Sequence, residues 1–339
     1  MDYLCYHHND MDGKAAANEV RLFLEGSGVH CTANDFIMKG YDDPFNEKDY
    51  DQKIVFIVDL SFTTNNVTKL LGICEKARKV IWIDHHKSSL EIIEDDSLKH
   101  ILDKYDNLEY YLNNNACGAV LTFLYFKGII DTDIFDIFGF ENTFIRYHVD
   151  STSYTVGDII SYKATTINEM AHLRFLNLID LYDRWVFDDN QEPVLFNYGT
   201  YSNNTNLYLD NGELNEFWEK ILNPFFIEDI IRKGTTIKNY IRFTADDELK
   251  ARSYECKIGW LKGIALNMSG NSMVFGDLIK KYDIVCLWEY DGKNKKYVYS
   301  LYTDRDDVDC TKIAQSYNKN GGGHRKAAGF SSDYLVLKP

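Results

Sequence analysis

One stretch of the sequence carries three polar residues whose side chains occur in metal sites. Val80–Ile83 is apolar, and Asp84, His85 and His86 follow it directly. A buried parallel strand is apolar on both faces, and ligands in open α/β sheets bind at the carboxyl ends of the strands. Carboxylate and imidazole together suit divalent ions such as Mn²⁺ or Zn²⁺. The alternative is a strand end whose polar residues only face water.

A second polar group follows the apolar segment Tyr3–Tyr6. His8, Asp10 and Asp12 alternate through a turn that ends at Gly13, and a helical pattern follows. The three side chains converge if the turn is extended, and the positive end of the helix dipole favours acids there. An N-cap aspartate before a glycine turn is the simpler interpretation, but it accounts for only one of the three residues.

A third apolar segment, residues 53–58, ends in the carboxylate of Asp59. Right-handed βαβ crossovers would place the ends of all three strands at one edge of a parallel sheet. Three separate strands that each end in Asp or His therefore favour a metal site over three solvated strand ends.

Helical patterns cover residues 115–125, 131–147 and 167–183. The first begins with small residues, which either allow close approach to a metal site or serve plain helix packing. The last ends in Asp183, our candidate for a final metal carboxylate, with Asp180 as the alternative.

The length and the pattern predict an α/β protein of two domains, because 339 residues exceed one ordinary domain. We assign residues 1–190 to a catalytic domain with a parallel sheet, in which residues 91–112 form a charged, irregular surface excursion. Residues 191–235 are a helical connector, and residues 236–339 form a smaller domain with a mixed sheet. The strands and helices predicted in the smaller domain are residues 263–267, 284–288 and 297–301, and residues 275–282 and 310–317.

The smaller domain contains one glycine-rich segment. Its members are Gly321, Gly322, Gly323, His324 and Arg325, and small residues follow. Consecutive glycines allow positive φ, so backbone N–H groups can turn towards an anion, and arginine and histidine can donate to a phosphate. The alternative is a glycine-rich hairpin whose charges point outward.

Charge, cysteine content and apolar runs indicate which partners and which cell compartment to expect. The formal net charge of −15 disfavours a broad basic face for long duplex DNA, although a local pocket can still hold short nucleotides. Seven cysteines without CxxC spacing, and no secretion signal, favour free thiols in a reducing cytoplasm. No apolar run approaches the length of a membrane span. We therefore expect a cytoplasmic protein without a membrane partner.

These segments together resemble the DHH phosphoesterases that carry a DHHA1 domain. The residues behind the resemblance are His8–Gly13, Asp59, Asp84–His86, Asp183–Trp185 and Gly321–Gly329, in family order across nearly the whole chain. The chain is most similar to the small nanoRNases and related dinucleotide phosphodiesterases, and it lacks the extra domains of RecJ-type exonucleases. The resemblance implies an active site in the cleft between the two domains.

The resemblance also implies two Mn²⁺ ions, with Mg²⁺ or Co²⁺ as alternatives, and a set of ligands for them. Asp59 would bridge the ions. The remaining ligands would be His8 and Asp10 for one ion, and Asp12, His85 and Asp183 for the other.

Further roles follow from the same resemblance. Asp84 would act as a ligand or support the ligands, and His86 would face the substrate phosphate as a donor or acid. His324 and Arg325 would grip a terminal phosphate. Some relatives carry an arginine where this chain has Tyr302, and Arg305 is the candidate to replace it.

The expected function is hydrolysis of short oligonucleotides (nanoRNA) to nucleoside 5′-monophosphates, with Asp84 and His86 as catalytic residues. One alternative is a phosphatase or phosphodiesterase of a small nucleotide, such as 3′-phosphoadenosine 5′-phosphate, pGpG or a cyclic dinucleotide. Another is a nucleotide-binding sensor without turnover. Family likeness also allows a homodimer.

Overall fold

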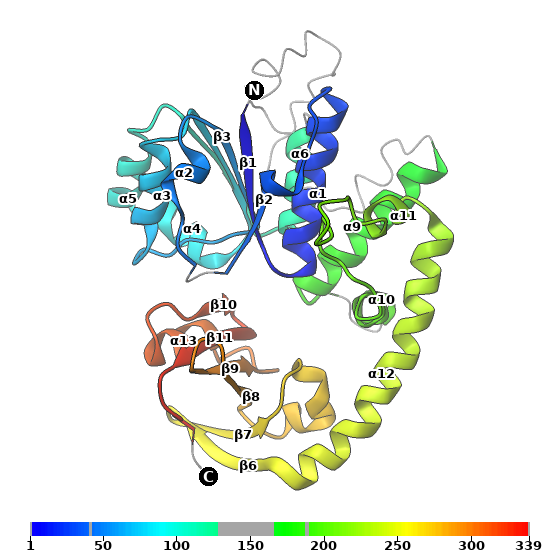
Figure 1. Cartoon of the computed structure of the whole chain (residues 1–339). Coiled ribbons are helices and arrows are strands. Elements are labelled where there is room, and N and C mark those ends of the chain that lie inside the picture. Colours follow the sequence, from blue (N-terminus) through cyan, green and yellow to red (C-terminus); the bar gives the residue numbers. More distant parts are fainter. Residues whose placement is uncertain (1, 41–42, 128–165, 187–189, 338–339) are drawn as a thin grey trace. The chain divides into compact units, whose positions relative to one another are not determined.

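The computed structural model describes residues 2–40, 43–127, 166–186 and 190–337. The chain divides into two compact units, residues 1–235 and residues 236–339 (Figure 1). The helix predicted at residues 131–147 lies outside the described residues.

The first unit is built on a five-stranded sheet in the order β2-β1-β3-β4-β5. Its strands are β1 (Tyr3–His8), β2 (Phe36–Lys39), β3 (Ile54–Val58), β4 (Lys79–Asp84) and β5 (Leu108–Leu112). All four pairings are parallel. This confirms the predicted parallel sheet, and the three strands recognised in the sequence are the neighbours β1, β3 and β4.

Helices cover both faces of this sheet (Figure 1), which is why β3 is apolar and buried along its whole length. One face packs against α1 (Met11–Gly26), α6 (Gly118–Phe126) and α9 (Ile167–Asp183). The other packs against α3 (Val67–Cys74), α4 (Lys87–Glu94) and α5 (Asp96–Leu102). Alternation along β1 sends Cys5 into the first core and Leu4 and Tyr6 into the second.

The predicted irregular excursion at residues 91–112 is wrong. This segment contains the second half of α4, all of α5 and the edge strand β5. The helices are short and amphipathic, with few buried side chains such as Ile92 and Leu102. Every residue of β5 is only half-buried. The charged residues that suggested a loop are the exposed faces of regular elements.

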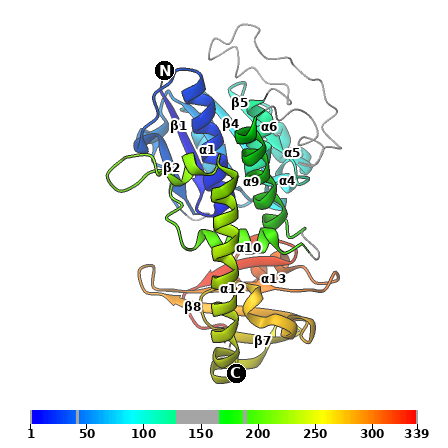
Figure 2. The ribbon, with the colours of Figure 1, turned by 90° about the vertical axis from the view of Figure 1, so that its right-hand side faces the viewer.

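The segment predicted as a helical connector contains α10 (Glu192–Thr200), α11 (Phe217–Lys220) and the first part of α12 (Pro224–Arg252). Two short elements of the first unit, η1 (Ala33–Asp35) and α2 (Glu47–Tyr50), complete its list of helices among the described residues. Helix α12 is continuous from the first unit into the second (Figure 2). The predicted domain boundaries stay predictions.

The second unit contains a mixed six-stranded sheet in the order β10-β11-β9-β8-β7-β6. Its strands are β6 (Ser253–Ile258), β7 (Leu261–Asn267), β8 (Ile284–Asp291), β9 (Lys296–Tyr302), β10 (Gly322–His324) and β11 (Ala327–Ser332). Only β7 and β8 pair in parallel. The predicted helix at residues 310–317 is α13 (Cys310–Tyr317), whereas residues 275–282 largely belong to a 3₁₀ segment, η2 (Ser272–Lys280), broken at Gly276.

Among the described residues, no helix is both long and apolar enough to cross a membrane.

Candidate metal centre

The predicted site residues of the first unit gather at the carboxyl edge of its sheet. His8 ends β1, Asp59 follows β3 directly, and Asp84 ends β4. The strand order reverses between β1 and β3, and such a switch point is where doubly wound sheets bind ligands. The fold therefore brings these side chains together as the sequence predicted.

The turn between β1 and α1 holds His8 and Asp10 against each other. Asp10 is the N-cap of α1, and its Oδ1 accepts a hydrogen bond of 2.9 Å from the backbone N–H of Gly13. Its Oδ2 lies 2.7 Å from Nδ1 of His8. A Cβ at position 13 would lie 2.5 Å from the carbonyl oxygen of His8, so only glycine allows this tight turn. Asp10 is thus both a helix cap and a partner of His8.

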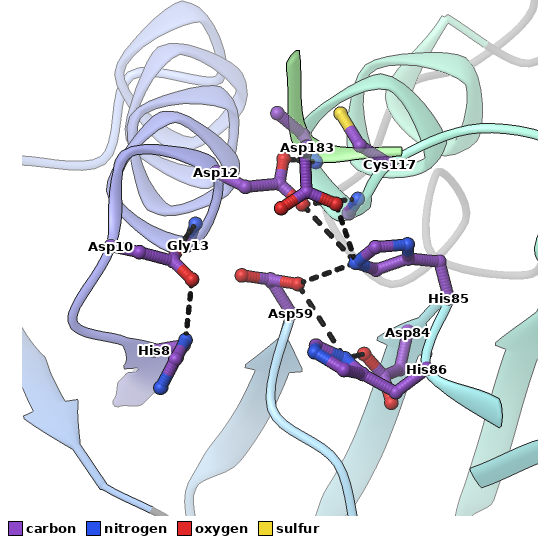
Figure 3. A network of polar contacts seen from close by, with 12 residues as sticks. His8, Asp10, Asp12, Gly13, Asp59, Asp84, His85, His86, Cys117 and Asp183 are labelled. Atoms are coloured by element: carbon purple, nitrogen blue, oxygen red, sulfur yellow. Dashed lines mark hydrogen bonds and ion pairs between the residues drawn. The ribbon is translucent and has the colours of Figure 1, made fainter. Parts of the chain in front are cut away.

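His85 points one ring nitrogen towards three carboxylates (Figure 3). Its Nε2 is 3.2 Å from Asp59 Oδ1 and 3.4 Å from Asp12 Oδ2. The same nitrogen is 3.4 Å from Asp183 Oδ2. These four residues come from four segments that lie far apart in the sequence, and Asp183 rather than Asp180 is the acid of α9 beside His85.

Asp12 is fixed by the first turn of α6. Its two carboxylate oxygens accept hydrogen bonds from the backbone N–H groups of Gly118 (2.7 Å) and Ala119 (2.8 Å). A Cβ at position 118 would lie 2.5 Å from Cβ of Asp59. Of the two roles left open for the small residues here, close approach to the candidate centre is therefore required at Gly118.

Asp59 combines an unfavourable backbone conformation with a buried carboxylate. Its backbone is left-handed, with φ of 50°, which is uncommon for a residue other than glycine. Its side chain is 1% exposed, and neither carboxylate oxygen accepts a hydrogen bond. A buried carboxylate without such donors is costly unless a cation compensates it.

The acids of the centre disfavour one another's ionisation. Burial, and then the charge of Asp10, raise the pKa of Asp12 to about 6. Burial and the neighbouring Asp12 also raise the pKa of Asp59 and of Asp183 well above the usual range. A divalent cation would relieve this repulsion and favour the ionised forms.

His86 and Asp84 form a separate hydrogen-bonded pair. Nδ1 of His86 lies 2.8 Å from Asp84 Oδ1, and Ser89 Oγ donates to Asp84 Oδ2 at 2.5 Å. Burial lowers the pKa of His86, but the Asp84 carboxylate outweighs burial and the pKa rises to about 9. Burial raises the pKa of Asp84, yet His86 brings it to about 2. Because both oxygens of Asp84 are engaged, its geometry suits support of His86.

Several groups of His and Asp side chains have donor atoms within 4.8 Å of one another, close enough to share a cation, and two of these groups consist of predicted ligands of a single ion. We call them the His8 group (His8, Asp10 and Asp59) and the His85 group (Asp12, His85 and Asp183). Imidazole with carboxylate is a donor set for Mn²⁺, Zn²⁺ or Mg²⁺. The buried oxygens of Asp59, which accept no hydrogen bond, fit such an ion. Cation binding by these residues stays a prediction.

Sequence reasoning missed the backbone amides of Cys117, Gly118 and Ala119, and also Ser89. The run of small residues at 116–119 was the only signal for the amides. Nothing in the sequence pointed to Ser89, since a serine in the first turn of a helix is common.

The glycine-rich segment of the second unit folds as the hairpin β10–β11, with Arg325 and Lys326 in the turn. Gly323 has φ of 135°, and a Cβ there would lie 2.6 Å from the carbonyl oxygen of Ala327. The guanidinium of Arg325 donates to the carbonyl oxygen of Asp306 at 2.6 Å. The backbone is thus the hairpin of the alternative interpretation, and phosphate binding by His324 and Arg325 stays a prediction.

Arg305 lies in the same unit and is already paired. Its guanidinium donates to both carboxylate oxygens of Asp307, at 2.8 and 2.6 Å, and also contacts Asp283. To bind a phosphate, Arg305 would have to leave these partners.

No model of a known protein family matches the chain, and no curated protein matches it either. Among solved structures, the chain is similar to the DHH domain of a member of the s1p family of ribosomal proteins. The identity is 14% and the TM-score 0.50, over 97% of this chain and 82% of that one.

Two further similar structures have lower TM-scores. The pGpG-specific phosphodiesterase PggH from Vibrio cholerae is 12% identical, with a TM-score of 0.36 over 97% of this chain and 92% of that one. RecJ in complex with Mn²⁺ from Thermus thermophilus is 13% identical, with a TM-score of 0.46 over 98% of this chain. This chain covers 49% of that RecJ chain.

The sheet, its helices and the cluster of acids and histidines define an α/β protein with a candidate divalent-metal centre at the carboxyl edge of a parallel sheet. The likeness to a DHH domain identifies the fold as that of the DHH proteins. The resemblance predicted from the sequence is therefore confirmed for the fold.

Proposed function

We propose that this protein is a metal-dependent phosphodiesterase that hydrolyses short oligonucleotides, nanoRNA among them, to nucleoside 5′-monophosphates. The observation that carries the proposal is the pair of adjacent donor groups, the His8 group and the His85 group, at the switch point of the sheet. The six residues of the two groups, and Asp84 with them, all lie within the first unit.

The two groups would hold two divalent cations, Mn²⁺ by preference and Mg²⁺ or Co²⁺ as substitutes. Such a pair supplies Lewis-acid polarisation of a phosphoryl oxygen and a nucleophile at neutral pH. In the protein itself, Asp59 lies beside both groups, and its carboxylate faces His85.

His86 supplies the proton in this proposal. With a pKa of about 9, its imidazole is protonated near neutral pH, and the carboxylate of Asp84 accepts from Nδ1. In this proposal the other ring nitrogen donates towards the oxygen of the leaving nucleoside. Asp84 acts by orienting His86, and Ser89 in turn orients Asp84.

Substrate selection is assigned to the second unit. We propose that the segment Gly321–Arg325 binds a terminal phosphate through the backbone N–H groups of its glycines and the side chains of His324 and Arg325. Arg305 would join them only after exchange of its carboxylate partners. A grip on one end of the substrate would favour short chains. We further propose a cytoplasmic location, and a homodimer stays a prediction.

A panel of substrates tests this proposal. RNA dinucleotides and pentanucleotides labelled at the 5′ end are incubated with the full chain in Mn²⁺, beside 3′-phosphoadenosine 5′-phosphate, pGpG and a cyclic dinucleotide. We expect stepwise release of nucleoside 5′-monophosphates from the short RNAs. If the protein hydrolyses only one of the small nucleotides, that nucleotide is the substrate in place of nanoRNA. Tight nucleotide binding without any hydrolysis would identify a sensor and contradict the proposal.

A further inference from the structure

Asp180, one turn before Asp183 on α9, is buried and fully engaged. Only 2% of the surface of Asp180 is exposed. Its Oδ1 accepts hydrogen bonds from the backbone N–H of Cys117 at 2.7 Å and from Nε of Arg184 at 2.8 Å. Its Oδ2 accepts from Nη2 of Arg184 at 2.5 Å. Both oxygens are used, so Asp180 offers no oxygen to a cation while this arrangement holds.

The contact with Cys117 joins α9 to the start of α6. Three successive backbone N–H groups begin α6. The first N–H groups of a helix have no acceptor within the helix, so they need acceptors from elsewhere. Asp180 accepts from the first, at Cys117. Asp12 accepts from the next two, at Gly118 and Ala119. One helix start therefore sets the distance between the carboxylates of Asp12 and Asp180.

Arg184 completes the link at the other end. It is the C-cap residue of α9, and its backbone N–H donates to the carbonyl oxygen of Asp180 at 3.1 Å. Its guanidinium closes back onto the Asp180 side chain through two hydrogen bonds, an arrangement that is directional as well as strong. Asp183 lies within this closed final turn, so the link limits where its carboxylate can lie.

From this geometry we infer that Asp180 and Arg184 are positioning residues for the His85 group. They hold the last turn of α9 against the first turn of α6, and thereby hold Asp183 opposite Asp12 and His85. The inference rests on the proposed function insofar as the His85 group binds a cation. Arg184 also compensates the charge of Asp180, which would otherwise add to the repulsion among the neighbouring acids.

The His8 group supplies an internal reference. His8 and Asp10 are held by the turn before α1, through the hydrogen bond from Gly13, and not by the link between α6 and α9. Loss of the link should therefore weaken the cation site of the His85 group much more than that of the His8 group. A general loss of folding would weaken both.

The test is isothermal titration calorimetry of the metal-free full chain with Mn²⁺, for wild type and for Arg184→Met. We expect the affinity of one of two binding events to fall by about 10- to 100-fold, the range found for supports of metal ligands. Arg184→Lys keeps the charge but loses the two-bond geometry, and it should recover part of the affinity. Arg174→Met is the matched control, because Arg174 lies on the same helix and pairs with Glu192 and Glu228.

A buried Asp180 charge without its partner could unfold Arg184→Met, so a second variant keeps the test decisive. The double variant Asp180→Asn, Arg184→Met removes both charges and retains a side-chain oxygen for the Cys117 amide. It should fold and still show the selective loss. Two unchanged affinities in a folded variant would overturn the inference. A wild-type chain that binds no Mn²⁺ would instead overturn the proposed function.

Discussion

At the scale of single residues, Asp59 shows that the candidate centre works against the stability of the metal-free chain. Its backbone has positive φ, its side chain is buried, and its pKa is raised by burial and by Asp12. Sites under functional demand commonly carry such a cost. Removal of the Asp59 charge should therefore raise the free energy of unfolding when no cation is present and lower it when a cation is bound.

The variant Asp59→Asn tests this directly. Asparagine tolerates the left-handed backbone and removes the charge. In the presence of a chelator we expect the variant to be more stable than wild type, by roughly 1 kcal/mol or more, since a buried charge without donors is lost. In Mn²⁺ the order should reverse. Chemical denaturation with and without Mn²⁺ measures both, and a metal-free variant less stable than wild type would contradict the account.

The pH dependence of the metal-free chain follows from Asp12. An acid whose pKa is raised to about 6 in the folded state, above an unfolded value of about 4, binds protons more tightly when folded. The stabilisation of the folded state by protonated Asp12 is complete below about pH 4 and is lost as the pH rises through about 6, a change of about 3 kcal/mol.

Unfolding midpoints in a chelator at about pH 5 and about pH 8 check this sign. The metal-free chain should be more stable at the lower pH, and Asp12→Asn should flatten the dependence. Mn²⁺ should oppose the trend, because cations compete with protons for the same carboxylates. Equal stability at both pH values in wild type would refute the raised pKa.

At the scale of elements, α6 packs closely on the end of β3 at the candidate centre. Gly118→Ala would place a Cβ 2.5 Å from Cβ of Asp59, and both atoms are fixed to backbone. We expect a loss of roughly 1–3 kcal/mol and weaker Mn²⁺ binding, because α6 must shift away from Asp59.

Gly72→Ala is the matched control for that change. Gly72 also lies in a helix, α3, but an added Cβ there meets nothing within 4 Å. The control should be stabilised by roughly 0.5–1 kcal/mol through helix propensity alone. Thermal unfolding and Mn²⁺ titration compare the two, and equal behaviour would argue against a close approach at Gly118.

The elements also show what the sequence could predict. β1, β3 and β4 were recognisable because they are buried on both faces, which makes them apolar throughout. β5 and β6 are mostly half-exposed edge strands, so their mixed composition resembled loop or surface segments. Asp59 and Asp84 to His86 were placed correctly at strand ends, since a strand end fixes the edge of the sheet.

Contacts distant in sequence were not predictable in the same way. Asp180 and Asp183 lie on the same helix turn, and sequence spacing alone cannot decide which acid faces His85. The decision depends on the Cys117 amide and Arg184, which engage Asp180. The hydrogen bonds from Gly118 and Ala119 to Asp12 span more than a hundred positions, and no local pattern encodes such a pairing.

At the scale of the whole molecule, the net charge of −15 limits the class of nucleic acid that can bind. Long duplex DNA needs many lysine and arginine contacts with phosphates, and its affinity for this chain should be weak. We expect no binding of long duplex DNA by fluorescence anisotropy at roughly physiological salt, while a labelled dinucleotide binds in the presence of Mn²⁺. Tight, salt-dependent binding of the duplex would contradict the assignment to short substrates.

We propose that the acids and histidines at the carboxyl edge of the first sheet catalyse metal-dependent phosphodiester hydrolysis. The most direct measurement is hydrolysis of a labelled RNA dinucleotide by wild type and by His85→Ala, each stripped with a chelator and then supplied again with Mn²⁺. We expect that stripping abolishes the activity of wild type, that Mn²⁺ restores it, and that His85→Ala stays inactive although folded. Hydrolysis that survives stripping, or a His85→Ala variant as active as wild type, would contradict it.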